Sequence, residues 1–163
     1  MAGGMLTRPP YAVTPGASAE RNLIVDTWRR SLQDAPAYAK VPTRGYVFWV
    51  TDLIRHFLGT GRELSLRSSD RLYVARDVER PTYVYGWLLC RDQRPGLALV
   101  YVYVKGPHRR EGIAKELLAS ALEATEDGPL TYAFRTRFDR WFDDLGMTFA
   151  PVEELQFGKR VAS

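Results

Sequence analysis

The sequence has a single cysteine, Cys90, and only two histidines, His56 and His108. One cysteine cannot form a disulfide within the chain, and these three residues lack the spacing of a zinc site. No stretch comes near the roughly 20 apolar residues of a membrane-spanning helix, and the opening MAGGMLTRPP has no apolar signal-peptide core. We therefore expect a cytoplasmic protein with no metal and no membrane partner.

Extremes of composition are also missing. Hydrophobic residues make up 45% and charged residues 26% of the 163 residues, which is average for folded soluble proteins and argues against a disordered, collagen-like or coiled-coil chain. The length fits one domain over residues 1–163, with 1–17 as an extended N-terminal segment. The net charge of +4 mildly favours anionic partners, which include nucleic acid, a phosphate-bearing cofactor and an acidic protein.

Apolar periodicity predicts two helices before most of the strands. Ile24, Trp28 and Leu32 recur every four residues in a helix from Ser18 to about Gln33. A second helical period runs from Tyr46 to Phe57 and ends at Gly59. Ahead of both, prolines in the extended segment restrict any strand there to an edge strand at Tyr11 to Thr14.

Strand-like runs then predict an antiparallel meander at Leu72 to Val74, Tyr83 to Arg91 and Leu97 to Val104. The last run, LALVYVYV, is almost wholly apolar and aromatic, which is typical of a central strand buried on both faces. Strict alternation along it puts Tyr101 and Tyr103 on one face of the sheet. The other face then carries Val100, Val102 and Val104.

The remaining chain predicts four more elements: a helix from Ile113 to Leu122, a strand from Leu130 to Arg135, a helix from Phe138 to Leu145 that stops at Gly146, and a closing hairpin from Met147 to Lys159. The aromatic closing hairpin offers a surface for pairing in a homodimer. The sequence leaves the oligomeric state open.

One segment carries a chemical signal: VYVKGPHRREGIAKELL, from Val102 to Leu118. A buried strand runs into a short basic loop, and Gly112 opens the next helix. The first N–H groups of a helix have no partner within it and lie at the positive end of its dipole, so they bind phosphate oxygens. Gly112 allows a phosphate close to the backbone, and Arg109 and Arg110 add charge-assisted contacts. This pattern predicts an anion site.

The run R-R-x-G-I-A from Arg109 to Ala114, between a buried strand and a Leu-Leu helix, resembles the acyl-coenzyme A binding motif of the GCN5-related N-acetyltransferases (GNAT). Neither the G-x-x-x-x-G-K-[ST] loop nor the G-x-G-x-x-G fingerprint occurs. The specific match covers about Leu97 to Ala124, and the element order extends it over most of the chain. The resemblance implies an α/β (α+β) fold with a mixed, mostly antiparallel central sheet of six to seven strands flanked by about four helices.

The resemblance also implies acetyl-coenzyme A, or another acyl-coenzyme A, as the cofactor. The pantetheine arm would pair with the strand backbone at a splayed sheet edge, and the pyrophosphate would lie on loop N–H groups. The implied cofactor-binding residues are Val102, Tyr103, Val104, Arg109, Arg110, Glu111, Gly112, Ile113, Ala114 and Lys115. The family transfers the acyl group directly to an amine in a ternary complex, with a backbone N–H near Tyr103 or Val104 stabilising the oxyanion.

The chain departs from the family pattern at the proton carriers. The usual general-acid tyrosine, four residues before the glycine that ends its helix, is Phe142 here. An asparagine often found seven residues earlier is Arg135, and the acidic residue of the fourth strand is missing from LALVYVYV. Tyr101 and Tyr103 are the best-placed substitutes as catalytic residues, although packing within the sheet explains these aromatics as well.

The resemblance places the acceptor, a primary amine on a small molecule or a protein, beside the connection between the first two helices. Tyr38, Arg44 and Trp49 are the candidate substrate-binding residues there, and a connector without function is an equal alternative. Phe142 motivates a second hypothesis, a non-catalytic GNAT-fold module that binds coenzyme A or a protein partner. A basic nucleic-acid-associated protein is the third, and we do not expect it because clustered Lys and Arg with interleaved aromatics are lacking.

Overall fold

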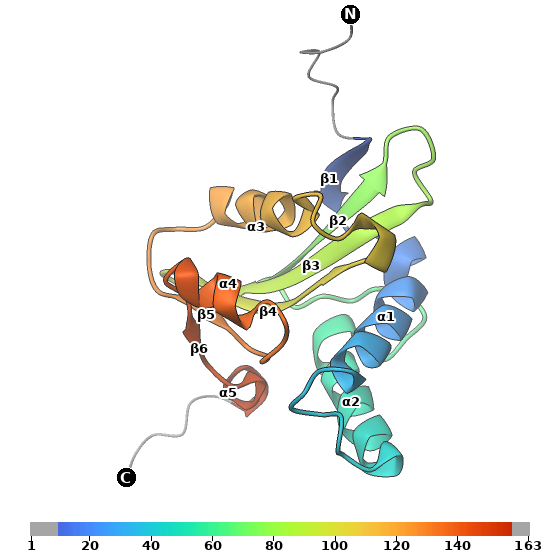
Figure 1. The fold of residues 1–163 in the computed structure, drawn as a ribbon, viewed down its shortest axis with the longest axis vertical. Coiled ribbons are helices and arrows are strands. Elements are labelled where there is room, and N and C mark those ends of the chain that lie inside the picture. The colour runs from blue at the N-terminus through green and yellow to red at the C-terminus, as the bar shows by residue number, and fades with distance from the viewer. Residues whose placement is uncertain (1–9, 158–163) are drawn as a thin grey trace, which may run out of the picture.

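The computed structural model describes residues 10–157. A six-stranded sheet runs in the order β1-β2-β3-β4-β5-β6 (Figure 1). Strands β1 to β4 are each antiparallel to the next, and β5 and β6 continue the sheet in parallel. Their bounds are Tyr11–Pro15, Asp70–Asp77, Val84–Asp92, Leu97–Val104, Leu130–Tyr132 and Thr148–Phe149. This mixed sheet, with its antiparallel meander and its edge strand β1, confirms the expected fold class.

Helices cover both faces of the sheet (Figure 1). The helices α1 and α2 pack on one face and α3 on the other, with the short helices α4 and α5 near the C-terminal end. Their bounds are Arg21–Gln33, Thr43–Leu58, Ile113–Glu123, Asp139–Asp144 and Val152–Phe157. Between residues 10 and 157, none of these helices has the length and apolar character that crossing a membrane requires.

Each face of the sheet has its own apolar core. On one face, Trp28 of α1 packs against Phe57 of α2 and Trp87 of β3, with ring centroids 6.0 and 5.7 Å away. On the other face, Leu117 of α3 packs in a cluster that contains Cys90 of β3. Burial raises the pKa of the Cys90 thiol to about 12, so this residue is a core side chain and not a nucleophile.

A bulge in β4 changes which side chains share a face. The register with β3 shifts between Leu99 and Tyr101, which makes Val100 an extra residue on β4. One extra residue reverses the alternation beyond it. As a result, Val100 packs in the same cluster as Tyr101, beneath α1 and α2, while Val102 and Val104 join the cluster under α3. The expectation that Val100 shares a face with Val102 and Val104 is therefore wrong.

The end of the described chain is not the expected hairpin. β6 spans only Thr148–Phe149, pairs in parallel with β5, and is followed by helix α5. Pro151 precedes this helix, and Glu153 and Glu154 lie in its first turn, where carboxylates interact favourably with the helix dipole. The predicted hairpin is therefore wrong up to residue 157, and its last two residues lie outside the described residues. The homodimer surface inferred from it loses its basis.

Gly86 of β3 provides a direct test of strand packing next to the site. A Cβ atom there would lie 2.5 Å from the backbone oxygen of Tyr103 and 3.2 Å from the Cα of Val104. We expect Gly86→Ala to lower the free energy of unfolding by about 1–3 kcal/mol, because an inserted methyl group forces backbone apart. Chemical denaturation measures this change.

Gly45 of α2 is the matched control, since a Cβ atom there meets nothing within 4 Å. Gly45→Ala should leave stability unchanged or raise it by up to ~1 kcal/mol through helix propensity. Equal destabilisation by both substitutions would contradict the close approach of β3 and β4.

His56 predicts a pH dependence of stability. The guanidinium groups of Arg67 and Arg91 lie 3.1 and 3.2 Å from its two ring nitrogens. Burial, together with these two arginines, lowers the pKa of His56 below 6.5. The unfolded chain therefore binds the proton more tightly, and stability falls as pH drops below about 6.5. We expect His56→Gln to flatten the melting-temperature profile between pH 7 and 5, and an unchanged slope would contradict this role.

Candidate functional site

The loop between β4 and α3 has the unusual backbone that the sequence motif requires. A short 3-10 turn at Gly106–His108 is followed by Arg110 with φ 69° and Gly112 with φ 81°. Both residues are in the left-handed region, which glycine adopts without strain and arginine rarely adopts. A Cβ atom on Gly112 would meet nothing within 4 Å. The backbone at Gly112 therefore faces open space large enough for a ligand atom.

The start of α3 presents free donors to this space. Gly112 caps the helix without a side-chain hydrogen bond, and the amide of Glu116 forms the first helical bond, to the Gly112 oxygen (3.1 Å). The amides of Ile113, Ala114 and Lys115 find no acceptor among residues 10–157. Free N–H groups at the positive end of a helix are groups to which anions commonly bind.

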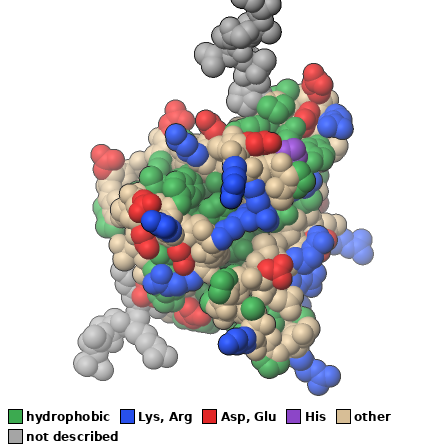
Figure 2. Space-filling view, in the orientation of Figure 1, with side chains coloured by type: hydrophobic (Ala, Val, Ile, Leu, Met, Phe, Trp, Pro, Cys, Tyr) green, Lys and Arg blue, Asp and Glu red, His purple; other side chains and the backbone are tan. Residues whose placement is uncertain are grey.

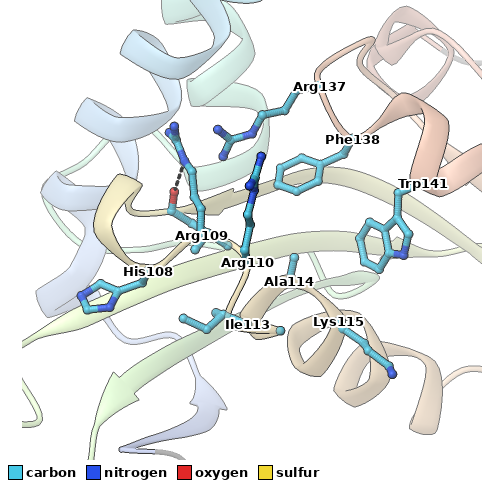
Figure 3. A pocket seen from close by; sticks show the side chains of 11 residues that line it. His108, Arg109, Arg110, Ile113, Ala114, Lys115, Arg137, Phe138 and Trp141 are labelled. Carbon is cyan, nitrogen blue, oxygen red and sulfur yellow. Dashed lines mark hydrogen bonds between the residues drawn. The ribbon is translucent and has the colours of Figure 1, made fainter.

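A cavity of about 710 Å³, which we call the basic cavity, opens between this loop and the start of α4. Of the described residues that line it, four are cationic and none is acidic: Arg109, Arg110, Lys115 and Arg137. Figure 3 shows the guanidinium groups of Arg109, Arg110 and Arg137 turned toward one another across the opening. Lys and Arg side chains gather in the middle of this face (Figure 2).

The three guanidinium groups lack acidic partners. None of Arg109, Arg110 and Arg137 forms a salt bridge within residues 10–157. Burial and the neighbouring Arg109 lower the pKa of Arg137. An anion in the cavity would relieve this repulsion. Arg137 and Phe138 are not among the predicted cofactor residues, and they line the cavity because of their place at the start of α4.

β4 and β5 part next to the basic cavity. They pair only from Leu97 to Leu99 of β4, and the last backbone bond joins the Ala133 amide to the Leu99 oxygen (3.0 Å). The chain after β5 then turns away into α4, so the predicted strand to Arg135 ends at Tyr132. The second half of β4 is therefore an open sheet edge.

The backbone groups on this edge belong to Val102 and Val104. On the opposite side of β4, the Lys105 amide donates to the Tyr85 oxygen of β3 (2.9 Å). Alternation in an antiparallel pair then directs the N–H and C=O groups of Val102 and Val104 away from β3. Arg109 Nε donates to the Val104 oxygen (3.3 Å) from this side. The edge can thus pair with an extended, amide-containing ligand.

His108 lines the basic cavity and contacts Tyr83, Tyr85 and Glu111. Its Nε2 lies 2.9 Å from the Tyr83 hydroxyl, and its Nδ1 lies 3.4 Å from Glu111. Its ring also packs on Tyr85 at 4.3 Å. The Tyr85 hydroxyl donates to Asp77 (2.5 Å), which lowers the pKa of Asp77 and raises that of Tyr85 to about 12. The Glu111 side chain does not line the basic cavity.

A second cavity of about 240 Å³, which we call the tyrosine cavity, lies beside the first. Its floor contains Tyr101 and Tyr103 of β4, and Ser31 and Asp34 at the end of α1 form one wall. Three residues line both cavities: Arg109, Arg137 and Phe138. The two cavities therefore adjoin at these side chains, beside the open edge of β4.

The two tyrosines differ in environment. Tyr101 is 5% exposed, stacks on Trp28 and shares a 2.8 Å hydrogen bond with Ser31. Burial raises its pKa to about 12. Tyr103 is partly exposed, and its hydroxyl forms no hydrogen bond with residues 10–157. Of the two predicted catalytic residues, Tyr101 therefore has a packing role and Tyr103 has the free hydroxyl.

The structure also shows where the two departures from the family pattern, Phe142 and Arg135, lie. Phe142 is 3% exposed and packs against Tyr132 and Trp141, with centroids 5.1 and 5.3 Å away. Its position has no group that donates or accepts a proton. Arg135 is exposed, and its guanidinium lies over the ring of Phe149 at 4.3 Å, outside both cavities.

The predicted acceptor residues lie apart from the tyrosine cavity. Tyr38 stacks on Trp49 at 5.1 Å, and both rings contact Phe134. Arg44 is exposed at the start of α2. None of the three lines either cavity. The connection between α1 and α2 reaches the cavity through its beginning, at Asp34, Ala35 and Pro36.

Among the described residues, no three His, Cys, Asp or Glu side chains are grouped so that they could hold a metal ion.

No protein-family model matches this sequence, and no curated protein is similar enough to count as a relative. Solved structures do match. One is the histone acetyltransferase HPA2 and related acetyltransferase from Corynebacterium glutamicum, at 18% identity and a TM-score of 0.62, covering 85% of this chain and 84% of that one. A possible acetyltransferase from Clostridium difficile matches at 12% identity and a TM-score of 0.54, covering 86% and 91%.

A third structure is the PaiA N-acetyltransferase from Thermoplasma acidophilum in complex with coenzyme A, at 14% identity and a TM-score of 0.51, covering 69% of this chain and 70% of that one. At these identities the likeness concerns the fold. The chain therefore has the fold of the GCN5-related N-acetyltransferases.

Proposed function

We propose that the protein is an N-acyltransferase that uses acetyl-coenzyme A, or a related acyl-coenzyme A, to acylate a primary amine. One observation carries the proposal: a basic cavity at a helix N-terminus adjoins a second cavity beside the unpaired edge of β4. A carrier with a diphosphate at one end and an amide-containing arm at the other needs both features. One solved structure with this fold contains coenzyme A.

The residues present fit such a carrier. The free amides of Ile113, Ala114 and Lys115 would hold the diphosphate, and the open space at Gly112 leaves room for it. Arg110 and the Lys115 side chain add positive charge. The edge of β4 at Val102 and Val104 would bind the pantetheine amides. These assignments keep the whole predicted stretch from Arg109 to Lys115, with Glu111 acting through its backbone.

When bound, the carrier supplies an activated thioester: the amine nitrogen bonds to the carbonyl carbon, the carbon–sulfur bond breaks, and a proton from the nitrogen is balanced by one gained at sulfur. In this chain the proton donor is not at position 142, where Phe142 is buried. Tyr103 lines the tyrosine cavity, and its hydroxyl forms no hydrogen bond with residues 10–157. We assign it as the general acid.

The substitution at Phe142 also favours the second candidate, a module that binds coenzyme A without transfer. A general acid contributes about 10²–10⁴-fold in rate, and a thiolate with a pKa near 8.5 leaves tolerably well without one. A free-thiol release assay with a panel of amines separates the candidates. Binding without turnover on any amine would establish the module.

Gly112→Asp tests the cofactor site. We expect calorimetry with acetyl-coenzyme A to show binding to the native protein and a loss of at least about tenfold in the variant, because a carboxylate would enter the space of the diphosphate. Gly112→Asn is the matched control, since asparagine has nearly the same size and tolerates a left-handed φ without adding charge. It should weaken binding less than Gly112→Asp does, because it fills the same space without repelling the diphosphate. Absence of heat and of a thermal shift with the native protein at millimolar ligand would overturn the proposal.

A second pair of variants tests the general acid. We expect Tyr103→Phe to slow thiol release by about 10²-fold or more while leaving the melting temperature and the affinity for coenzyme A nearly unchanged. Tyr101→Phe should instead lower the free energy of unfolding by about 1 kcal/mol, through loss of the bond to Ser31, and leave the rate within a few-fold. Equal rates for Tyr103→Phe and the native protein would rule out this assignment.

A further inference from the structure

We infer that the acceptor is a small primary amine that also carries a carboxylate, as a free amino acid does, and that Arg137, assisted by Arg109, binds the carboxylate. This inference rests on the proposed function, because it takes the tyrosine cavity as the acceptor side. Its basis is the charge and size of that cavity and the position of the two arginines between the two cavities.

The location of the two arginines sets them apart from the other cations. Arg110 and Lys115 line only the basic cavity, where the free amides of α3 already provide an anion site. Arg109 and Arg137 line the tyrosine cavity as well. The bond from Arg109 Nε to the Val104 oxygen keeps that side chain at the edge of β4. These two guanidinium groups therefore face the acceptor side.

The sign of the charge decides which amines fit. Arg137 is partly desolvated, and both burial and Arg109 lower its pKa. A polycationic acceptor, such as a polyamine or a basic peptide, would bring more positive charge against guanidinium groups that have no carboxylate partner within residues 10–157. A carboxylate would instead form a paired, two-pronged contact with a guanidinium. The cavity therefore selects for an anionic group near the amine.

The wall that contains Asp34 has the opposite sign. Asp34 caps the C-terminal end of α1, where the helix dipole is negative, and it forms no salt bridge within the described range. Ser31 stands one turn earlier on the same wall. An amine in its ammonium form is attracted to this side while its carboxylate is attracted to Arg137. A zwitterion matches both walls, whereas a simple amine or a simple acid matches only one.

Size narrows the class further. At roughly 30 Å³ per water molecule, a cavity of about 240 Å³ holds about eight waters. That space accommodates a group of the size of a single amino acid. Apolar and aromatic groups form much of the remaining lining: Ala35, Pro36, Tyr101, Val102, Tyr103 and Phe138. An amino acid with an uncharged side chain therefore fits best.

The test compares amino acids with their carboxamides, which differ in one negative charge. L-methionine, L-phenylalanine and their carboxamides are titrated into the full chain saturated with coenzyme A, with saturation-transfer NMR as the binding readout. Initial rates of thiol release from acetyl-coenzyme A are measured with the same four compounds. We expect at least one acid to bind about tenfold or more tightly than its carboxamide and to be acylated faster.

Arg137→Gln should reduce this preference to near unity, and Arg137→Lys should retain part of it. Arg140→Gln is the matched control, because Arg140 is exposed and lies outside both cavities, so the same loss of charge there should leave the preference intact. An unchanged preference in Arg137→Gln would remove the role of Arg137.

The possible failures are distinguishable. Carboxamides that bind and react as well as the acids would overturn the inference while leaving the acyltransferase in place. Acids that bind selectively without thiol release would overturn the proposed transfer and support the ligand class. Failure of all four compounds to bind would overturn the assignment of the cavity to amino-acid-like ligands.

Discussion

The parting of β4 from β5 is the constraint on which the site depends. Backbone N–H and C=O groups at a sheet edge need partners, and β4 has none from β5 beyond Leu99. The unpaired edge at Val102 and Val104 is therefore available for a ligand that pairs like a strand. The same divergence makes room for Arg137 and Phe138, which enter the gap from the start of α4 and join the two cavities.

The bulge at Val100 decides which side chains of β4 lie on each face of the sheet. It turns Tyr101 and Tyr103 toward α1 and α2, and Val102 and Val104 toward α3. The face with the tyrosines forms the floor of the smaller cavity, and the face with the valines leads to the anion-binding start of α3. Without the extra residue, the tyrosines would lie under α3, and the hydroxyl of Tyr103 would not reach the tyrosine cavity.

The sequence predicts the features that depend on residues close together in the chain. The strand, the basic loop and Gly112 are contiguous, so motif spacing alone predicted the helix that starts at Ile113, and hydrophobic periods predicted the main helices and strands. Features set by tertiary contacts were missed. Val100 reads as an ordinary strand residue, Arg137 reaches the site only because β5 turns away, and Tyr38 pairs with Trp49 instead of lining a cavity. Helix α5 after Pro151 was not predicted, because the aromatic pattern of this segment resembles that of a strand.

Under the proposed function, the buried Phe142 leaves the departing thiolate without a proton donor at position 142. A departing thiolate needs either a proton or nearby positive charge, and cationic neighbours lower the pKa of a thiol. Tyr103 would supply the proton that position 142 cannot, and Arg109 and Arg137, which lie where the two cavities meet, would hold anionic groups beside it. Like charges held together repel one another, and a bound anion relieves that repulsion. The charge of this site therefore matches anionic groups on its ligands.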